Sequence, residues 1–197
     1  ILNDEIVGES ARRVFSDAKS MLKRIIDGRW LTANGIVGFL PANTVNDDDI
    51  EIYTDESRTE VAFTWRNVRQ QTEKREGVAN KCLADFIAPK FIDGKPSGIA
   101  DYIGIFAVTA GIGIEKKLAE FAAAHDDYRA TLLTALADRL AEAFAERLHE
   151  RVRKTLWGYA PEEALSNEEL VREKYRGIRP APGYPACPDH SLKPILF

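Results

Sequence analysis

The segment with the most chemical potential is the run from Arg179 to Pro188, which holds four prolines in ten residues. Proline fixes the backbone angle φ, so this run predicts an extended, preorganised loop that loses little entropy when it binds a ligand. Arg179 offers a planar guanidinium that suits a carboxylate or a phosphate. Tyr184 adds a flat ring and a hydroxyl directly after Gly183, whose lack of a side chain permits close approach of a ligand to the backbone.

Two glutamates on predicted helices could complement that loop. Glu142 and Glu173 supply carboxylates that can hold an ammonium group, so the whole set would suit a zwitterionic amino acid with an aromatic appendage. Two plainer interpretations remain open. The loop can be a surface strap in which Arg179 pairs with a neighbouring acid, and the glutamates can be solvated charges on helix faces.

Other kinds of site have little support in the sequence. The three histidines are scattered, and the two cysteines, Cys82 and Cys187, lie far apart without partners at metal-ligand spacing. We therefore expect no metal site, no disulfide framework and a reducing, cytoplasmic environment. A net charge of −4 argues against nucleic acid or an anionic membrane as a partner, and no apolar run approaches the roughly 18 residues that span a bilayer.

The elements that must position these residues begin with a helix and continue with strands. Apolar residues at three-four spacing from Val7 to Ile26 predict a helix with one buried face, which ends at Gly28. Four strands are then predicted, with the last expected to be central: 35–40 closed by Pro41, 50–53, 59–65 and 102–108. The segment 78–87 predicts a buried helical turn or two, and 93–98 a loop.

Helices dominate the remainder of the chain. A short helix is predicted over 115–124 and a long one from about His125 to Lys154. Ser166 and Glu169 form a capping box for a further helix that we expect to end at Gly177. This order of elements predicts an α+β fold in which helices pack on a twisted antiparallel sheet.

Several blocks, in this order, resemble the C-terminal domain of cobalamin-dependent methionine synthase. The resemblance covers nearly the whole chain and is carried by residues 69–74 (RQQTEK), 82–86 (CLADF), 100–104 (ADYIG), 135–144 (ALADRLAEAF), 157–159 (WGY) and 177–185 (GIRPAPGYP). It implies a helmet- or C-shaped α+β domain that binds S-adenosylmethionine. In this family the domain brings that ligand to cobalamin held by another module, flavodoxin or an equivalent reductase supplies an electron, and methylation restores the active enzyme.

The family's binding motif is an arginine, three residues and then Gly-Tyr, and it matches Arg179 to Tyr184 here. The resemblance implies that Arg179 binds the ligand's carboxylate, that the backbone of Ala181 meets its adenine or ribose, and that Tyr184 packs near its sulfonium. Residues implied to bind S-adenosylmethionine are thus Arg179, Pro180, Ala181, Gly183, Tyr184, Glu142 and Glu173. Asp138, one turn before Glu142, is implied to face the cobalamin. No residue is implied to be a catalytic acid or base.

The sequence also departs from the family. An acidic residue expected before Ile1 and an aromatic-glycine segment expected after Phe197 are absent, and 111–114 differs from the acidic stretch expected there. We therefore expect residues 1–197 to be a fragment of this activation domain, truncated at both ends. One alternative is a docking domain for the cobalamin module and flavodoxin that binds little ligand. A freestanding methyltransferase is disfavoured because no glycine-rich loop follows a strand.

Overall fold

A computed structural model describes residues 1–196 and divides them into two compact units. The first unit contains residues 1–36 and 106–152, and the second contains residues 37–105 and those from 153 onward. Two long strands, β1 (Thr32–Val45) and β6 (Asp101–Ile112), contribute residues to both units. No helix in the described part of the chain is long and apolar enough to cross a membrane.

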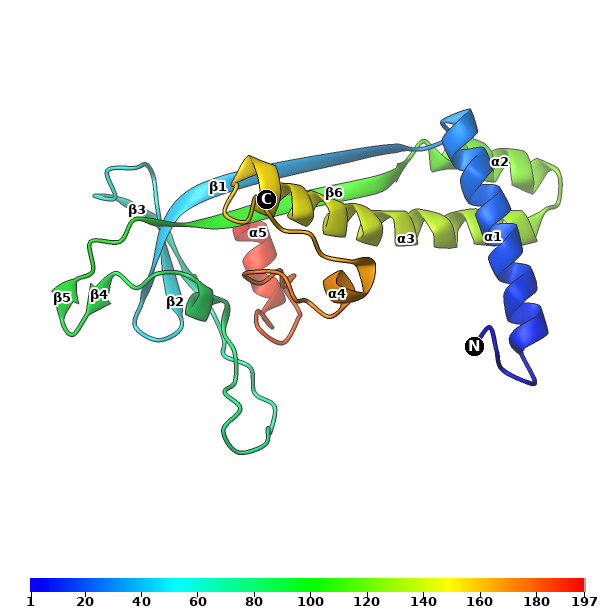
Figure 1. Cartoon of the computed structure of the whole chain (residues 1–197). Helices are drawn as coiled ribbons and strands as arrows, with labels where there is room; N and C mark the ends of the chain where they lie inside the picture. The colour runs from blue at the N-terminus through cyan, green and yellow to red at the C-terminus, as the bar shows by residue number, and fades with distance from the viewer. Residues whose placement is uncertain (197) are drawn as a thin grey trace. The chain divides into compact units, whose positions relative to one another are not determined.

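The first unit is built from three helices. These are α1 (Gly8–Gly28), α2 (Ile114–Ala123) and α3 (Asp127–Arg151), and Figure 1 shows α1 crossing α3. Met21 and Ile25 of α1 pack with Phe121 of α2 and Leu133 of α3 to form the buried core of this unit. The helices predicted from the three-four apolar spacing are therefore present, and each helix buries apolar side chains in this shared core.

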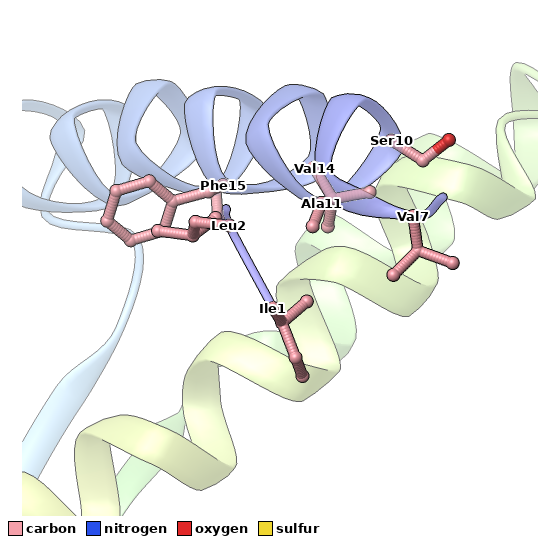
Figure 2. A pocket seen from close by; sticks show the side chains of 8 residues that line it. Ile1, Leu2, Val7, Ser10, Ala11, Val14 and Phe15 are labelled. Atoms are coloured by element: carbon pink, nitrogen blue, oxygen red, sulfur yellow. The ribbon is translucent and has the colours of Figure 1, made fainter. Parts of the chain in front are cut away.

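The apolar stripe of α1 is only partly buried, which corrects the predicted single buried face. Val14 and Phe15 are about half exposed, because the buried contacts of α1 come from Met21 and Ile25 in its C-terminal half. The N-terminal half borders an open apolar groove of about 490 Å³. Figure 2 shows Val7, Ala11 and Val14 projecting from one side of α1, and Ile1 lies on that same side, facing them. None of the predicted site residues lines this groove.

The second unit contains a four-stranded sheet in the order β3-β2-β1-β6 (Figure 1). Strand β2 (Asp49–Tyr53) pairs antiparallel with both β1 and β3 (Val61–Arg66). A small hairpin follows from β4 (Phe91–Ile92) and β5 (Lys95–Pro96). Ile50, Ile52 and Trp65 form the core with buried residues from the segments that cover the sheet, among them Cys82, Ala84, Ile87, Cys187 and Leu192.

The covering segments contain short helices. They are the 3-10 helix η1 (Leu83–Phe86), the π-helical turn η2 (Val152–Leu156), α4 (Asn167–Val171), the 3-10 helix η3 (His190–Leu192) and α5 (Lys193–Leu196). The predicted α+β class with an antiparallel sheet is confirmed. The helmet or C shape implied by the resemblance stays a prediction.

Two predicted strand features are wrong. Strand β1 continues through Pro41 to Val45, and its pairing with β2 runs from Ala42 to Val45. Strand β6 lies at one end of the described sheet, not at its centre. The predicted loop at 93–98 is mostly borne out: Asp93 and Gly94 form a turn at positive φ and 97–98 are irregular, and only Lys95–Pro96 forms a short strand.

Candidate functional site

The proline-rich segment folds into two consecutive turns, which corrects the predicted extended loop. The Tyr184 N–H donates to the Ala181 carbonyl at 3.0 Å, and the Cys187 N–H donates to the Tyr184 carbonyl at 2.9 Å. Pro182 and Pro185 each occupy the second position of a turn, where the fixed φ of proline is favourable. Gly183 follows Pro182 with φ 107°, as a type II turn requires. The prolines therefore stiffen turns instead of extending the chain.

The C-terminal side of this loop is fixed to the core of the second unit. The Gly183 N–H donates to the Cys187 carbonyl at 2.8 Å, and the Leu83 N–H donates to the Ala186 carbonyl at 2.9 Å. Cys187 is 2% exposed and packs in the same cluster as Cys82, and burial raises the pKa of both thiols. Two neutral, buried cysteines thus anchor the loop by packing.

A capped helical turn continues this anchoring. Asp189 accepts the Ser191 N–H at 2.8 Å, which lowers the pKa of Asp189 and starts η3. Leu192 at the end of η3 is buried in the core. The loop is therefore held on this side by both backbone hydrogen bonds and an apolar anchor.

The loop presents two of the predicted binding side chains. Tyr184 is 63% exposed, so its ring and hydroxyl are open to a ligand. Arg179 is half-buried, and its Nε atom is enclosed by the protein. Pro180, Ala181 and Gly183 lie between these two residues in the sequence, and Ala181 and Gly183 belong to the first turn. The structure thus brings five of the predicted residues together in one short segment.

His190 is a neighbour of this loop that sequence reasoning missed. A Cβ atom added to Gly183 would lie 2.4 Å from the His190 ring, so the glycine allows the ring to lie against the turn. His190 itself is exposed. The sequence signal was the close spacing of Gly183, Cys187 and His190, but only the turn shows that the ring lies next to the glycine.

The remaining predicted residues lie elsewhere. Glu173 follows α4 as an exposed residue with φ 53°, because α4 ends at Val171 and not at Gly177 as predicted. Glu142 and Asp138 are exposed on α3 in the first unit, and Glu142 pairs with Arg139 at 2.9 Å. The roles of these three residues in ligand binding stay predictions.

Arg69, in the segment 69–74 that resembles the family, forms hydrogen bonds within the protein. Arg69 donates to Asp85 at 2.8 Å and to Asp48 at 2.6 Å, and it also donates to the carbonyl of Asn80. These bonds raise the pKa of Arg69 and lower the pKa of Asp85. The Arg69 guanidinium therefore holds together the two ends of the long loop between β3 and η1.

Within the described residues no group of three or more His, Cys, Asp or Glu side chains is placed to hold a metal ion. What the loop offers chemically is a guanidinium, a phenol and backbone groups on a stiff scaffold. This arrangement can bind and orient a ligand that carries a carboxylate and a flat group.

Comparison with known proteins gives a consistent result. The sequence matches the family described as "Vitamin B12 dependent methionine synthase, activation domain" over residues 1–197. Among solved structures, it is similar to the MetH reactivation domain bound to AdoHcy, with 59% identity and a TM-score of 0.85. The match covers all of this chain but 58% of that one. The chain therefore belongs to the family of vitamin B12-dependent methionine synthase activation domains.

Proposed function

We propose that this chain binds S-adenosylmethionine through the Arg179–Tyr184 loop and presents it to the cobalamin carried by another module of the same enzyme. The observation that supports this most directly is the two-turn loop, which holds Arg179 and an exposed Tyr184 on one stiff segment. The similar solved domain was crystallised with AdoHcy, which is the demethylated form of the same ligand.

The chemistry of the loop fits that ligand. S-adenosylmethionine carries a carboxylate, which the Arg179 guanidinium can hold with two parallel hydrogen bonds. Its adenosyl part is flat and polar at its edges, which suits the backbone of Ala181. Its sulfonium is positive, and Tyr184 can offer the face of its ring to that charge. Glu173 and Glu142 are proposed to contribute negative charge near the ammonium or sulfonium.

The contribution of this chain to the reaction is positional. The bound ligand supplies a methyl group to the reduced cobalamin of the full-length enzyme. None of the proposed binding residues has to move a proton in that step, so the protein acts by holding the methyl donor in a productive orientation. An isolated chain is therefore expected to show no turnover.

The wider role follows from the family. We propose that the full-length enzyme is a cytoplasmic methyltransferase that forms methionine from homocysteine with methyltetrahydrofolate as the methyl donor. Its cobalamin module is the intramolecular partner of this chain, with Asp138 facing the cobalamin. Flavodoxin or an equivalent reductase supplies the electron for reactivation. We further propose that residues 1–197 are one part of the complete activation domain.

The test is calorimetric titration of the chain with AdoHcy and with S-adenosylmethionine. Arg179→Ala should remove most of the binding and leave the thermal midpoint nearly unchanged, because a half-exposed loop side chain contributes little to the core. Arg66→Ala is the control, since Arg66 is an exposed arginine paired weakly with Asp49 at 3.4 Å.

Two results would contradict this proposal. A large fall in the thermal midpoint of Arg179→Ala would favour the surface-strap interpretation of the loop. A wild-type chain that shows no heat of binding with either ligand, even when residues flanking 1–197 are restored, would favour the docking-domain alternative.

A further inference from the structure

A buried ion pair lies outside the loop just described. Arg153 is fully buried, and it donates through Nε and Nη2 to the two carboxylate oxygens of Glu163 at 2.8 and 2.6 Å. The Glu163 side chain is 8% exposed. The Arg153 guanidinium also stacks on the ring of Tyr175, 4.4 Å from its centroid. Burying two charges is costly even when they are paired, so such a pair is weak evidence for stability alone.

The local backbone explains how Arg153 reaches this position. Arg153 lies in η2, where the last helical turn after α3 widens into π geometry. The Ala160 N–H returns to the Arg153 carbonyl at 2.9 Å, which folds residues 154–160 into a compact loop. π-turns are uncommon and are often found at functional sites. This one directs the guanidinium inward beneath Tyr175.

The segment that Arg153 holds leads directly into the binding loop. Tyr175 is separated from Arg179 by only three residues. The next residues are fixed by Tyr159, whose hydroxyl donates to the Arg176 carbonyl at 3.3 Å. Gly177 has φ 91°, and a Cβ atom there would lie 3.3 Å from the Tyr159 hydroxyl oxygen. The chain thus passes close over Tyr159 before it reaches Arg179.

Tyr159 is itself held firmly. Its ring meets Trp157 edge to face, with 5.4 Å between ring centroids. Burial raises the pKa of its hydroxyl, so Tyr159 stays a neutral donor at physiological pH. The N-terminal side of the loop is therefore attached to a cluster of aromatic and charged side chains that lies outside the Arg179–Tyr184 segment.

We propose that four residues, here called the loop anchor, are positioning residues that set ligand affinity by fixing the backbone that leads into Arg179. They are Arg153, Tyr159, Glu163 and Tyr175. This inference rests on the proposed function of the Arg179–Tyr184 loop. The turns and the core hold the loop on its C-terminal side, and the loop anchor holds it on the other. A loop fixed at one end only would have to be ordered by the ligand, which costs affinity.

The first test uses Tyr159→Phe, which removes one hydroxyl and keeps the buried ring. We expect AdoHcy affinity to fall about three- to tenfold, the range of one neutral hydrogen bond. The exchange of the Gly183, Tyr184 and Cys187 amide hydrogens should become faster, because these amides close the two turns. Tyr128→Phe is the matched control, since it removes one tyrosine hydrogen bond, to Asp17 at 2.8 Å, in the first unit.

The second test uses Gly177→Ala. An alanine at φ 91° is strained and would also press against Tyr159, so it should displace the start of the loop. Gly77→Ala is the control, because Gly77 has φ 81° but nothing within 4 Å of an added Cβ atom. Both variants carry the backbone strain, and only Gly177→Ala should lose AdoHcy affinity, by about tenfold.

The outcomes separate this inference from the proposed function. If the wild-type chain binds AdoHcy and both Tyr159→Phe and Gly177→Ala bind it equally well, the loop anchor has no positioning role. If the wild-type chain does not bind AdoHcy even when residues flanking 1–197 are restored, the proposed function fails, and the amide exchange of the loop still tests the anchor. A similar loss of affinity in Gly77→Ala or Tyr128→Phe would show a general structural effect and overturn the inference.

Discussion

At the residue scale, burial and partners decide what each arginine of this chain does. Arg179 is half-buried on the loop, Arg153 is fully buried against Glu163, and Arg69 is a partly exposed strap. The proline-rich sequence around Arg179 marks it as different, but nothing in the local sequence predicts that Arg153 is buried and that Arg69 is only partly exposed. The tertiary structure therefore decides how far each guanidinium is enclosed by the protein.

The Arg69 strap predicts a pH dependence of stability. The hydrogen bonds from Arg69 hold the pKa of Asp85 below its ordinary value. A group with a depressed folded pKa stabilises the protein above its unfolded pKa of about 3.9, and this contribution is lost as the pH falls through the folded pKa. Asp85→Asn should thus reduce the free energy of unfolding at pH 7, by no more than about 1 kcal/mol since both partners are partly exposed.

Urea unfolding of both proteins at several pH values measures this. The difference between wild type and Asp85→Asn should shrink steadily below about pH 4. Asp27→Asn serves as a control, because Asp27 pairs with Lys23 on an exposed face of α1. A difference that stays constant down to pH 3 would mean that hydrogen-bond geometry, and not charge, accounts for the loss.

Residue-level prediction from the sequence succeeded where the cause was local. The capping box of Ser166 and Glu169 is present as predicted, with the Glu169 N–H bonded to the Ser166 hydroxyl at 3.3 Å. The shared role of Arg179 and Tyr184 in one ligand site stays a prediction. Arg153 and His190 were not predicted, because their environments depend on segments far away or on one turn whose geometry the sequence leaves open.

At the element scale, periodicity predicted the helices well and their ends poorly. The long helix was predicted to reach Lys154, but α3 ends at Arg151 and gives way to the π-turn. Residues 152–156 have no proline or glycine that would stop a helix. The change in geometry accompanies the burial of Arg153, a tertiary effect that helix propensity does not contain.

The π-turn also places Trp157 against the sheet. This packing predicts at which strand glycine an added side chain would destabilise the fold. Trp157 packs on Phe39, with ring centroids 5.1 Å apart, and a Cβ atom at Gly104 would lie 3.1 Å from the Trp157 ring. Gly104→Ala should lower the free energy of unfolding by about 1–2 kcal/mol through overpacking. Gly38→Ala should be neutral or slightly stabilising, because nothing lies within 4 Å of its added Cβ atom.

Chemical denaturation of both glycine variants, followed by tryptophan fluorescence, provides the measurement. The Trp157 environment should change in the folded Gly104→Ala protein and not in Gly38→Ala. Equal stabilities for the two variants would show that Trp157 moves aside without cost and that the packing of β6 against this ring is loose.

At the scale of the whole molecule, the chain has two cores made from separate sets of residues. One is centred on Met21, Ile25, Phe121 and Leu133, and the other contains Ile50, Ile52 and Trp65. The prediction that residues 1–197 belong to one activation domain stays a prediction, and composition and periodicity do not reveal which apolar stripes meet. The Arg179–Tyr184 loop and the proposed loop anchor lie in the second unit.

This division predicts that damage to one core has local consequences. Met21→Ala and Ile52→Ala each remove a buried side chain and should each cost about 2–5 kcal/mol. Because units with separate cores can open separately, Met21→Ala should speed amide exchange mainly in α1, α2 and α3. The amides of the Arg179–Tyr184 loop should keep their protection in that variant, whereas Ile52→Ala should expose them. Uniformly faster exchange along the chain in both variants would show instead that the two cores unfold as one cooperative structure.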